Sequence, residues 1–82
     1  MIYTAKIEVS LRPEHRNPEG ETITHLLKEL DYFVEKVNVS KIYKIDIQAS
    51  SIAEAKVKAE EMSERLLANS ARDNYVISVV EQ

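Results

Sequence analysis

The sequence predicts an α+β domain of the ferredoxin-like split type, with the order βαββαβ and an antiparallel sheet that carries two helices on one face. Two segments alternate apolar and polar residues with a period of two, as strands buried on one face do: 3–11 and 43–49. Two other segments, 18–31 and 51–69, repeat apolar residues at helical spacing. With one glycine and two prolines the chain has no flexible linker, so residues 1–82 are expected to form a single domain.

The first strand is the most regular, and a polar loop separates it from the first helix. Its apolar residues alternate as far as Leu11, and the pattern stops at Pro13. Asn17 is suited to cap a helix, with Pro18 at the first helical position, where no amide proton is needed. The helix is expected over 18–31, and one apolar stripe runs along it: Ile23, Leu26, Leu27 and Leu30.

The middle of the chain is rich in strand-forming residues. Three valines predict a second strand over 34–39, and a third strand follows the turn at Ser40-Lys41. This turn lacks the Asn-Gly or Asp-Gly pair of a tight hairpin, so the two strands together form one long, bent β region. In the split βαβ arrangement the first and third strands lie in the middle of the sheet, and the second and fourth form its edges.

The last third of the chain predicts a long helix and a final strand. Ser51 and Glu54 have the spacing of a capping box, in which the serine hydroxyl accepts from the third helical amide and the glutamate accepts from the serine amide. The helix is expected to end near Asn69, a residue type that tolerates the left-handed conformation. The fourth strand follows over 75–80.

Composition limits the function classes. Fourteen acidic and eleven basic residues give a net charge of −3, without the positive surface of a nucleic-acid-binding protein. The absence of cysteine excludes a disulfide, a thiolate metal site and a cysteine nucleophile. No apolar run approaches the roughly 20 residues that span a bilayer, and no signal peptide is visible. We therefore expect a cytoplasmic protein that contacts neither nucleic acid nor membrane.

The open face of the expected sheet leaves two interpretations. Its central strands carry mixed charges that can pair across the sheet, so the face can simply be solvated. Val76 and Val80 favour the other interpretation, a face pressed against another chain, because these apolar side chains would otherwise be left in water. The tyrosines fall on the helix side, which argues against an RNA-recognition module.

The residues alone show no catalytic set. His15 and His25 lack the spacing of a metal-binding motif, and no nucleophile elbow, carboxylate pair or phosphate-binding loop is present. Gly20, the only glycine, stands in the first turn of a helix, where alanine would be better by roughly 1 kcal/mol. Either it completes a type I turn that starts at Asn17, or another backbone or a partner surface approaches too closely for a Cβ atom.

Several segments, taken in their order along the chain, resemble those of the PurS family. Residues 9–11 and 17–20, read as V-S-L and N-P-E-G, are similar to the V-x-L and D-P-x-G opening of that family. The other similar segments are 30–32, 37–41, 54–57, 62–69 and Tyr75. Asp31 and Ser40 replace usual glycines, and 70–72 replaces a more apolar, proline-containing stretch. Because these departures fall at turns and surfaces, they leave the fold unchanged.

The resemblance implies a small subunit of phosphoribosylformylglycinamidine (FGAM) synthase, a glutamine-dependent, ATP-driven ligase of purine biosynthesis. A PurS subunit has no active site and no cofactor of its own, since ATP and Mg act in the PurL synthetase. It acts as an adaptor that brings PurL and the PurQ glutaminase together for ammonia transfer, and it forms homodimers or tetramers. The alternative, from another class, is a stand-alone dimeric regulatory module that binds a small ligand.

The resemblance also suggests contact residues. Asn17, Pro18, Gly20 and Lys41 are candidate contacts with PurL or PurQ, and Val76 and Val80 are the candidate oligomer face. Because a side chain at position 20 is compatible with helical dihedrals, Gly20→Gln is expected to leave the fold intact.

Overall fold

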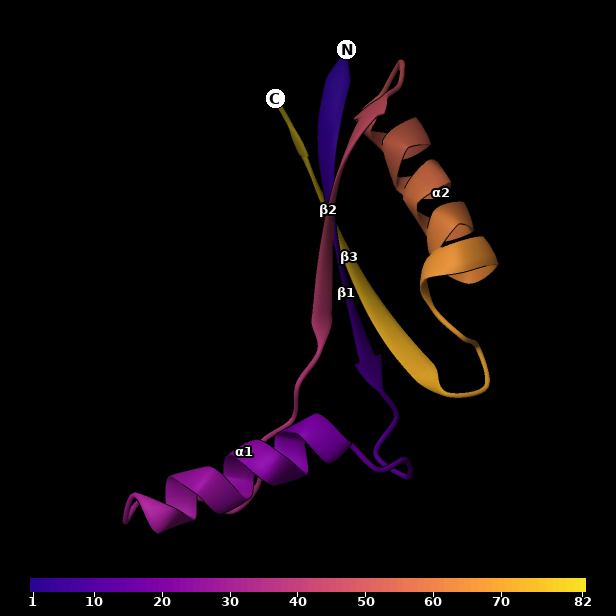
Figure 1. Cartoon of the computed structure of the whole chain (residues 1–82). Helices are drawn as coiled ribbons and strands as arrows, with labels where there is room; N and C mark the ends of the chain where they lie inside the picture. Colours follow the sequence, from indigo (N-terminus) through magenta and orange to yellow (C-terminus); the bar gives the residue numbers. More distant parts are fainter.

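The computed structural model describes all 82 residues. Three strands and two helices alternate along the chain, and a π-helical turn, η1, follows the second helix (Figure 1). In chain order the elements are β1 (Ile2–Leu11), α1 (Pro18–Glu29), β2 (Lys41–Gln48), α2 (Ile52–Met62), η1 (Ser63–Leu67) and β3 (Asp73–Glu81). The strands form one antiparallel sheet in the order β2-β1-β3, which confirms the α+β class with an antiparallel sheet and two helices.

The alternation of β1 determines the two faces of the sheet. Its odd-numbered side chains from Tyr3 to Val9 are buried, while the even-numbered ones point to the open face. Ile7 lies opposite Tyr43 on one side and Ile77 on the other, so all three strands direct apolar residues to the same face. The three tyrosines of the strands, Tyr3, Tyr43 and Tyr75, lie on this covered face, as the sequence predicts, whereas Tyr32 follows α1 and is exposed.

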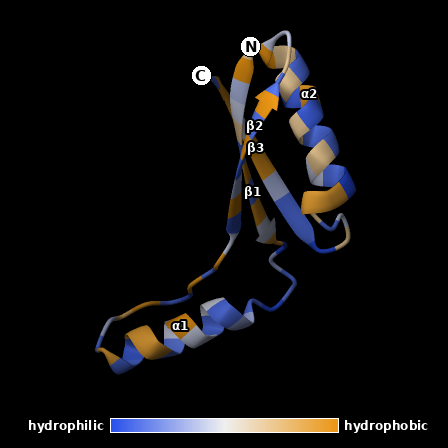
Figure 2. Cartoon of the chain, turned by 45° about the horizontal axis from the view of Figure 1, so that its top comes forward, coloured by the Kyte–Doolittle hydropathy of each residue, from blue (hydrophilic) through white to orange (hydrophobic).

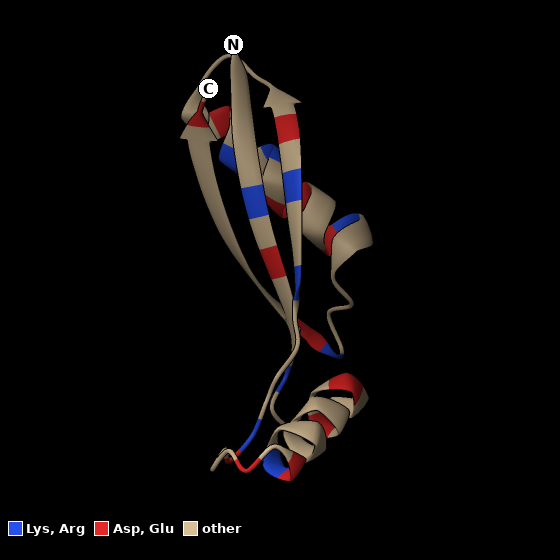
Figure 3. Ribbon diagram, turned by 60° about the vertical axis from the view of Figure 1, so that its left-hand side comes forward, with Lys and Arg blue, Asp and Glu red and all other residues tan.

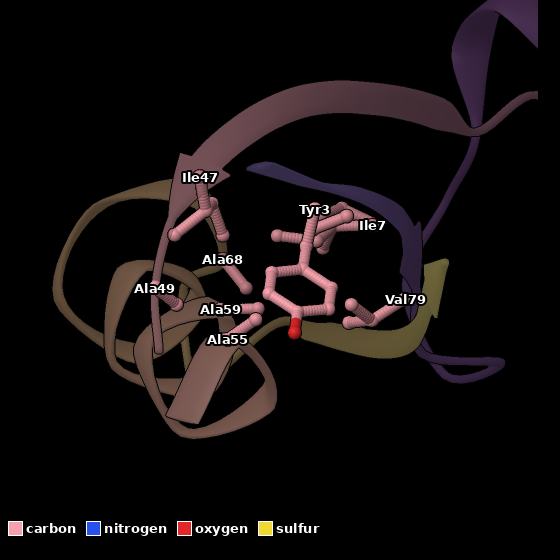
Figure 4. Close-up of a cluster of buried hydrophobic side chains, with 10 residues drawn as sticks. Tyr3, Ile7, Ile47, Ala49, Ala55, Ala59, Ala68 and Val79 are labelled. Atoms are coloured by element: carbon pink, nitrogen blue, oxygen red, sulfur yellow. The ribbon is translucent and has the colours of Figure 1, made fainter. Parts of the chain in front are cut away.

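Helix α2 covers this face and builds the core with small residues. Ala55 and Ala59 have no exposed surface, which lets the helix lie close to the ring of Tyr3 (Figure 4). The core also contains Ile7, Val9, Ile47, Ala49, Ala68 and Val79. Burial of these apolar groups is the main stabilising contribution in this half of the molecule.

The two ends of α2 differ in detail from the expectation. Ser51 caps the helix by accepting from the Glu54 amide at 3.1 Å, as predicted. Glu54, however, accepts from the amide and the hydroxyl of Ser50 rather than from Ser51. The helix ends in η1, where the Ala68 amide donates to the Ser63 carbonyl at 2.8 Å.

The left-handed residue of the chain is Asp31 and not Asn69. Asp31 has a φ of 69°, just after α1, at a position where the resemblance places a glycine. Asn69 needs no such conformation, because the preceding Ala68 is already extended and ends the helix there. A short polar side chain such as aspartate is one of the few that tolerate this backbone region.

Two details of the expected layout differ in this chain. Helix α1 does not lie on the sheet. It projects from the end of the sheet where β1 ends and β2 begins, which we call the foot of the sheet, and residues 34–39 run back along α1 instead of forming a strand (Figure 1). Consequently β2 is an edge strand rather than a central one. We call residues 12–40 the arm and the remainder the body. The radius of gyration is 16.1 Å, against about 12 Å for a compact domain of this length.

Candidate interaction surfaces

One side chain at the start of α1 joins the two halves of the arm. The Asn17 Oδ1 atom accepts from the Gly20 amide at 2.9 Å, which confirms the predicted helix cap. Its Nδ2 atom donates to the Val39 carbonyl, also at 2.9 Å. The same residue therefore starts the helix and holds the returning segment.

Thr24 makes a second connection one turn further along α1. Its hydroxyl donates to the Gly20 carbonyl at 2.7 Å and accepts from the Val37 amide at 3.0 Å. These two polar connections satisfy backbone groups of residues 34–39 that would otherwise need a neighbouring strand. The segment is thus held against α1, and it forms no strand of the sheet.

Gly20 lies between these two connections and is buried. A Cβ atom on Gly20 would lie 2.1 Å from the Val37 carbonyl oxygen, far inside van der Waals contact. Of the two interpretations of this glycine, the close approach of another backbone is the observed one, and that backbone belongs to the same chain. The expectation that Gly20→Gln leaves the fold intact is therefore wrong. We call Asn17, Gly20 and Thr24, with Val37 and Val39, the clasp.

The structure brings two of the candidate partner contacts together, since Asn17 and Lys41 line the same cavity, but it buries a third. Gly20 is buried under Val37, while Pro18 and Lys41 are exposed. Lys41 begins β2 and lines a cavity of about 290 Å³ between the foot of the sheet and the start of α1. A role in partner binding stays a prediction for these residues.

The sequence analysis does not identify Thr24 as a residue that holds the returning segment. The pattern that could have indicated it is a hydroxyl residue four positions after the glycine, on the same face of the helix.

The candidate oligomer face is exposed as expected. Val76 and Val80 on β3 are 69% and 57% exposed, and Ile42 on β2 adds a third exposed apolar side chain to this face. Charged side chains lie between them on β1 and β2 (Figure 3). An open apolar area beside charged rows is typical of an interaction surface rather than of a fully solvated one.

The expected charge pairing across this face is not present. The register places Lys6 opposite Lys44, which is unfavourable for two like charges. Asp46 instead accepts from the hydroxyl of Thr4 at 3.0 Å, and no ion pair forms among these strands. The two lysines therefore have no acidic partner within the chain.

The apolar stripe of α1 is also largely exposed, because the helix does not pack on the sheet. Leu30 is 67% exposed, and Leu26 is half exposed. Phe33, which follows the helix, is fully exposed. Figure 2 shows further hydrophobic residues on α1 and on the segment that runs back beside it. The sequence pattern locates the stripe on the helix correctly, but the surface it would cover is absent within the chain.

The titratable groups form surface pairs. Arg16 and Glu21 are joined at 2.6 Å, and this hydrogen bond lowers the pKa of Glu21 and raises the pKa of Arg16. His25 lies 3.2 Å from Glu29, one turn along α1.

No group of three histidine, aspartate or glutamate side chains is arranged to hold a metal ion. Neither α1 nor α2 has the length and the apolar composition of a membrane-spanning helix.

Known proteins match this chain over almost its whole length, both in sequence and in structure. A family model described as PurS, phosphoribosylformylglycinamidine (FGAM) synthase, matches residues 4–81. The chain is 38% identical over 74 residues to the synthase subunit PurS of Archaeoglobus fulgidus, covering 89% of this chain and 92% of that protein. Its structure matches PurS of Thermus thermophilus with a TM-score of 0.91 at 31% identity, over 100% of this chain and 99% of that one. It also matches a chain in the structure of PurLQS from Thermotoga maritima, with a TM-score of 0.89 at 26% identity, over 98% and 99% of the two chains.

Proposed function

The chain belongs to the PurS family of FGAM synthase subunits, and from that premise we propose that it is the non-catalytic adaptor that brings PurL and PurQ together. The observation that carries this proposal is the presence of two separate exposed apolar areas, on the open sheet face and on the arm, in a chain of only 82 residues. A small adaptor that contacts more than one neighbour needs such areas. The likeness to a chain of the Thermotoga maritima PurLQS structure supports the same association here.

In this proposal the chemistry takes place in the partners. PurQ releases ammonia from glutamine, and PurL uses ATP and Mg to transfer it to formylglycinamide ribonucleotide. This chain carries no cofactor and works in the cytoplasm. It also associates with itself, as a dimer or tetramer, through surfaces that the single chain leaves open.

Reconstitution with PurL and PurQ of the same organism tests the adaptor role. Omission of this chain is expected to lower glutamine-dependent FGAM synthesis strongly and to spare synthesis from an added ammonium salt, which needs no glutaminase. The double variant Val76→Glu/Val80→Glu places charges on the open face and is expected to weaken co-purification with the partners or with a second copy. Val57→Glu, at an exposed position on α2 outside this face, is the matched control.

The result that overturns the proposal is full glutamine-dependent synthesis by PurL and PurQ without this chain. The regulatory-module alternative predicts another result. A purified chain that binds a small metabolite and binds neither PurL nor PurQ would support the regulatory-module alternative.

A further inference from the structure

The centre of the open face carries two lysines that the fold brings together. Lys6 on β1, the middle strand of the sheet, lies directly opposite Lys44 on β2 (Figure 3). Both residues are exposed, and neither forms an ion pair within the chain. Like charges directly opposite each other destabilise a sheet. A position where the sequence works against its own fold in this way is typical of a functional site.

The two acidic side chains of the same face are held by other groups. Glu8 accepts a hydrogen bond from the Ser40 hydroxyl at 3.0 Å. Asp46 accepts from the Thr4 hydroxyl at 3.0 Å and from the side-chain amide of Gln82 at 2.7 Å. The register places these carboxylates in the rows on either side of the two lysines, so the face has a positive centre between acidic ends.

Exposed apolar side chains flank this positive centre. Val76, Val80 and Ile42 are each more than half exposed. The register places Val80 in the row on one side of the lysines, and Val76 and Ile42 in the row on the other side. Apolar groups around a charge exclude water when a partner binds, and the loss of water strengthens the interaction of that charge with an opposite one. The face is therefore suited to hold an ion pair away from solvent.

We propose that the open face binds a partner protein through a carboxylate-bearing, apolar surface, with aspartate or glutamate side chains of the partner on Lys6 and Lys44. The inference rests on the adaptor role in the proposed function and names the surface and the chemistry of one of its contacts. Lysine ammonium groups bind carboxylates through charge-assisted hydrogen bonds. Val76, Val80 and Ile42 then pack on apolar side chains of the partner around this ion pair.

Charge argues against a second copy of this chain as the occupant. When two copies meet face to face about a two-fold axis through the centre of the face, that centre meets itself. The lysines of both copies would then converge, and their ammonium groups would be buried without a carboxylate between them, which is costly. A nucleic acid fits poorly as well, because the chain carries a net charge of −3 and the apolar side chains of the face offer nothing to phosphate groups.

Charge reversal in the full-length chain tests this surface, with PurL and PurQ of the same organism as the probe. Lys6→Glu/Lys44→Glu should weaken binding to these partners by about tenfold or more, because like charges then face each other across the interface. The matched control, Lys56→Glu/Arg65→Glu, makes the same change of net charge at exposed positions on α2 and η1. It should change the affinity by less than about twofold, since solvent screens charges outside the interface. Titration calorimetry measures both.

A neutral variant separates the charge of the lysines from the shape of the face. Lys6→Gln/Lys44→Gln keeps long polar side chains and removes both charges. The affinity of the wild type should fall as the salt concentration rises, and that of this variant should fall less, because salt screens the pairing of lysine with carboxylate. Circular dichroism checks the fold. The variant is expected to be at least as stable as the wild type, since it no longer places like charges opposite each other.

The results distinguish this surface from the adaptor role. Wild-type binding to PurL and PurQ that is equally strong in Lys6→Glu/Lys44→Glu overturns the surface and leaves the adaptor role intact. If that variant changes the oligomeric mass in light scattering but not partner binding, a second copy covers the face, and the proposal is wrong. Binding of a mixed-sequence DNA duplex by the wild type, lost in the same variant, also overturns it. A wild-type chain that binds neither PurL nor PurQ overturns the adaptor role and the acidic partner together.

Discussion

The body and the arm are stabilised by different physical means. In the body, alternating strands and the alanines of α2 bury apolar side chains, and the sheet satisfies most of the backbone. In the arm, the polar contacts of the clasp join α1 to residues 34–39, and the apolar stripe stays exposed. A region that buries so little apolar surface opens more easily than a packed core. We therefore expect the two regions to respond separately to mutation.

The largest expected effect is on the body. Ile7 is fully buried in the central strand, and Ile7→Ala should lower the free energy of unfolding by about 2–5 kcal/mol. In a domain of this size the loss approaches the total stability. Urea denaturation followed by circular dichroism measures it. The control Val57→Ala, at an exposed position on α2 outside the open face, should change stability by less than about 1 kcal/mol.

Gly20→Ala tests whether the arm depends on the clasp. The new Cβ atom would press on the Val37 carbonyl oxygen, so residues 34–39 must move away from α1, at a cost of about 1–3 kcal/mol confined to the arm. Limited proteolysis should cut residues 31–40 faster than in the wild type, while the denaturation midpoint of the body changes little. Glu19→Ala, at an exposed neighbouring position, is the control. An uncut arm in Gly20→Ala would show that the clasp tolerates a Cβ atom.

A smaller effect is expected from one hydroxyl of the clasp. Thr24→Val keeps the shape of the side chain but leaves the Val37 amide without its acceptor, at a cost of about 1 kcal/mol. Hydrogen exchange of the Val37 amide should become roughly fivefold faster, as that energy implies. Thr22→Val removes a hydroxyl that bonds only to the Pro18 carbonyl, and it should leave this amide unchanged.

The smallest effect is a pH dependence at the start of α2. Hydrogen bonds from the Ser50 hydroxyl, Lys58 and the Ser50 amide lower the pKa of Glu54 from 4.5 to about 2. Because the folded-state pKa is depressed, this stabilisation is present above pH 4.5 and is lost as the pH falls toward 2. Between these values the denaturation midpoint of Glu54→Gln should fall less steeply than that of the wild type. Equal slopes would mean that Glu54 makes no such contribution.

The predictions from sequence succeed where the physical cause is local or periodic. The alternation of β1 and the spacing of Asn17, Pro18 and Gly20 each specify a structure within a few residues, and the strand and the helix cap are observed as predicted. The candidate surface at Val76 and Val80 also follows from alternation, since it needs only the face to which each residue points.

The predictions that fail concern packing and pairing partners that are distant in the sequence. The valines of 34–39 favour a strand, but the segment forms none, because pairing needs a neighbour that local preference cannot specify. Likewise, the stripe at Leu26 and Leu30 shows which helix face is apolar without showing what covers it. Both expectations assume that one chain supplies every partner.

The sequence by itself determined the body of this protein, because its periodic apolar residues find their partners within the same sheet and helix. Only the tertiary structure decided the role of Gly20 and the position of the arm. Whether a Cβ atom fits at position 20 depends on the Val37 carbonyl, seventeen residues away, and no local pattern encodes a distance of 2.1 Å. Where α1 lies depends on the competition between the sheet face and the clasp, which is settled only when the whole chain is folded.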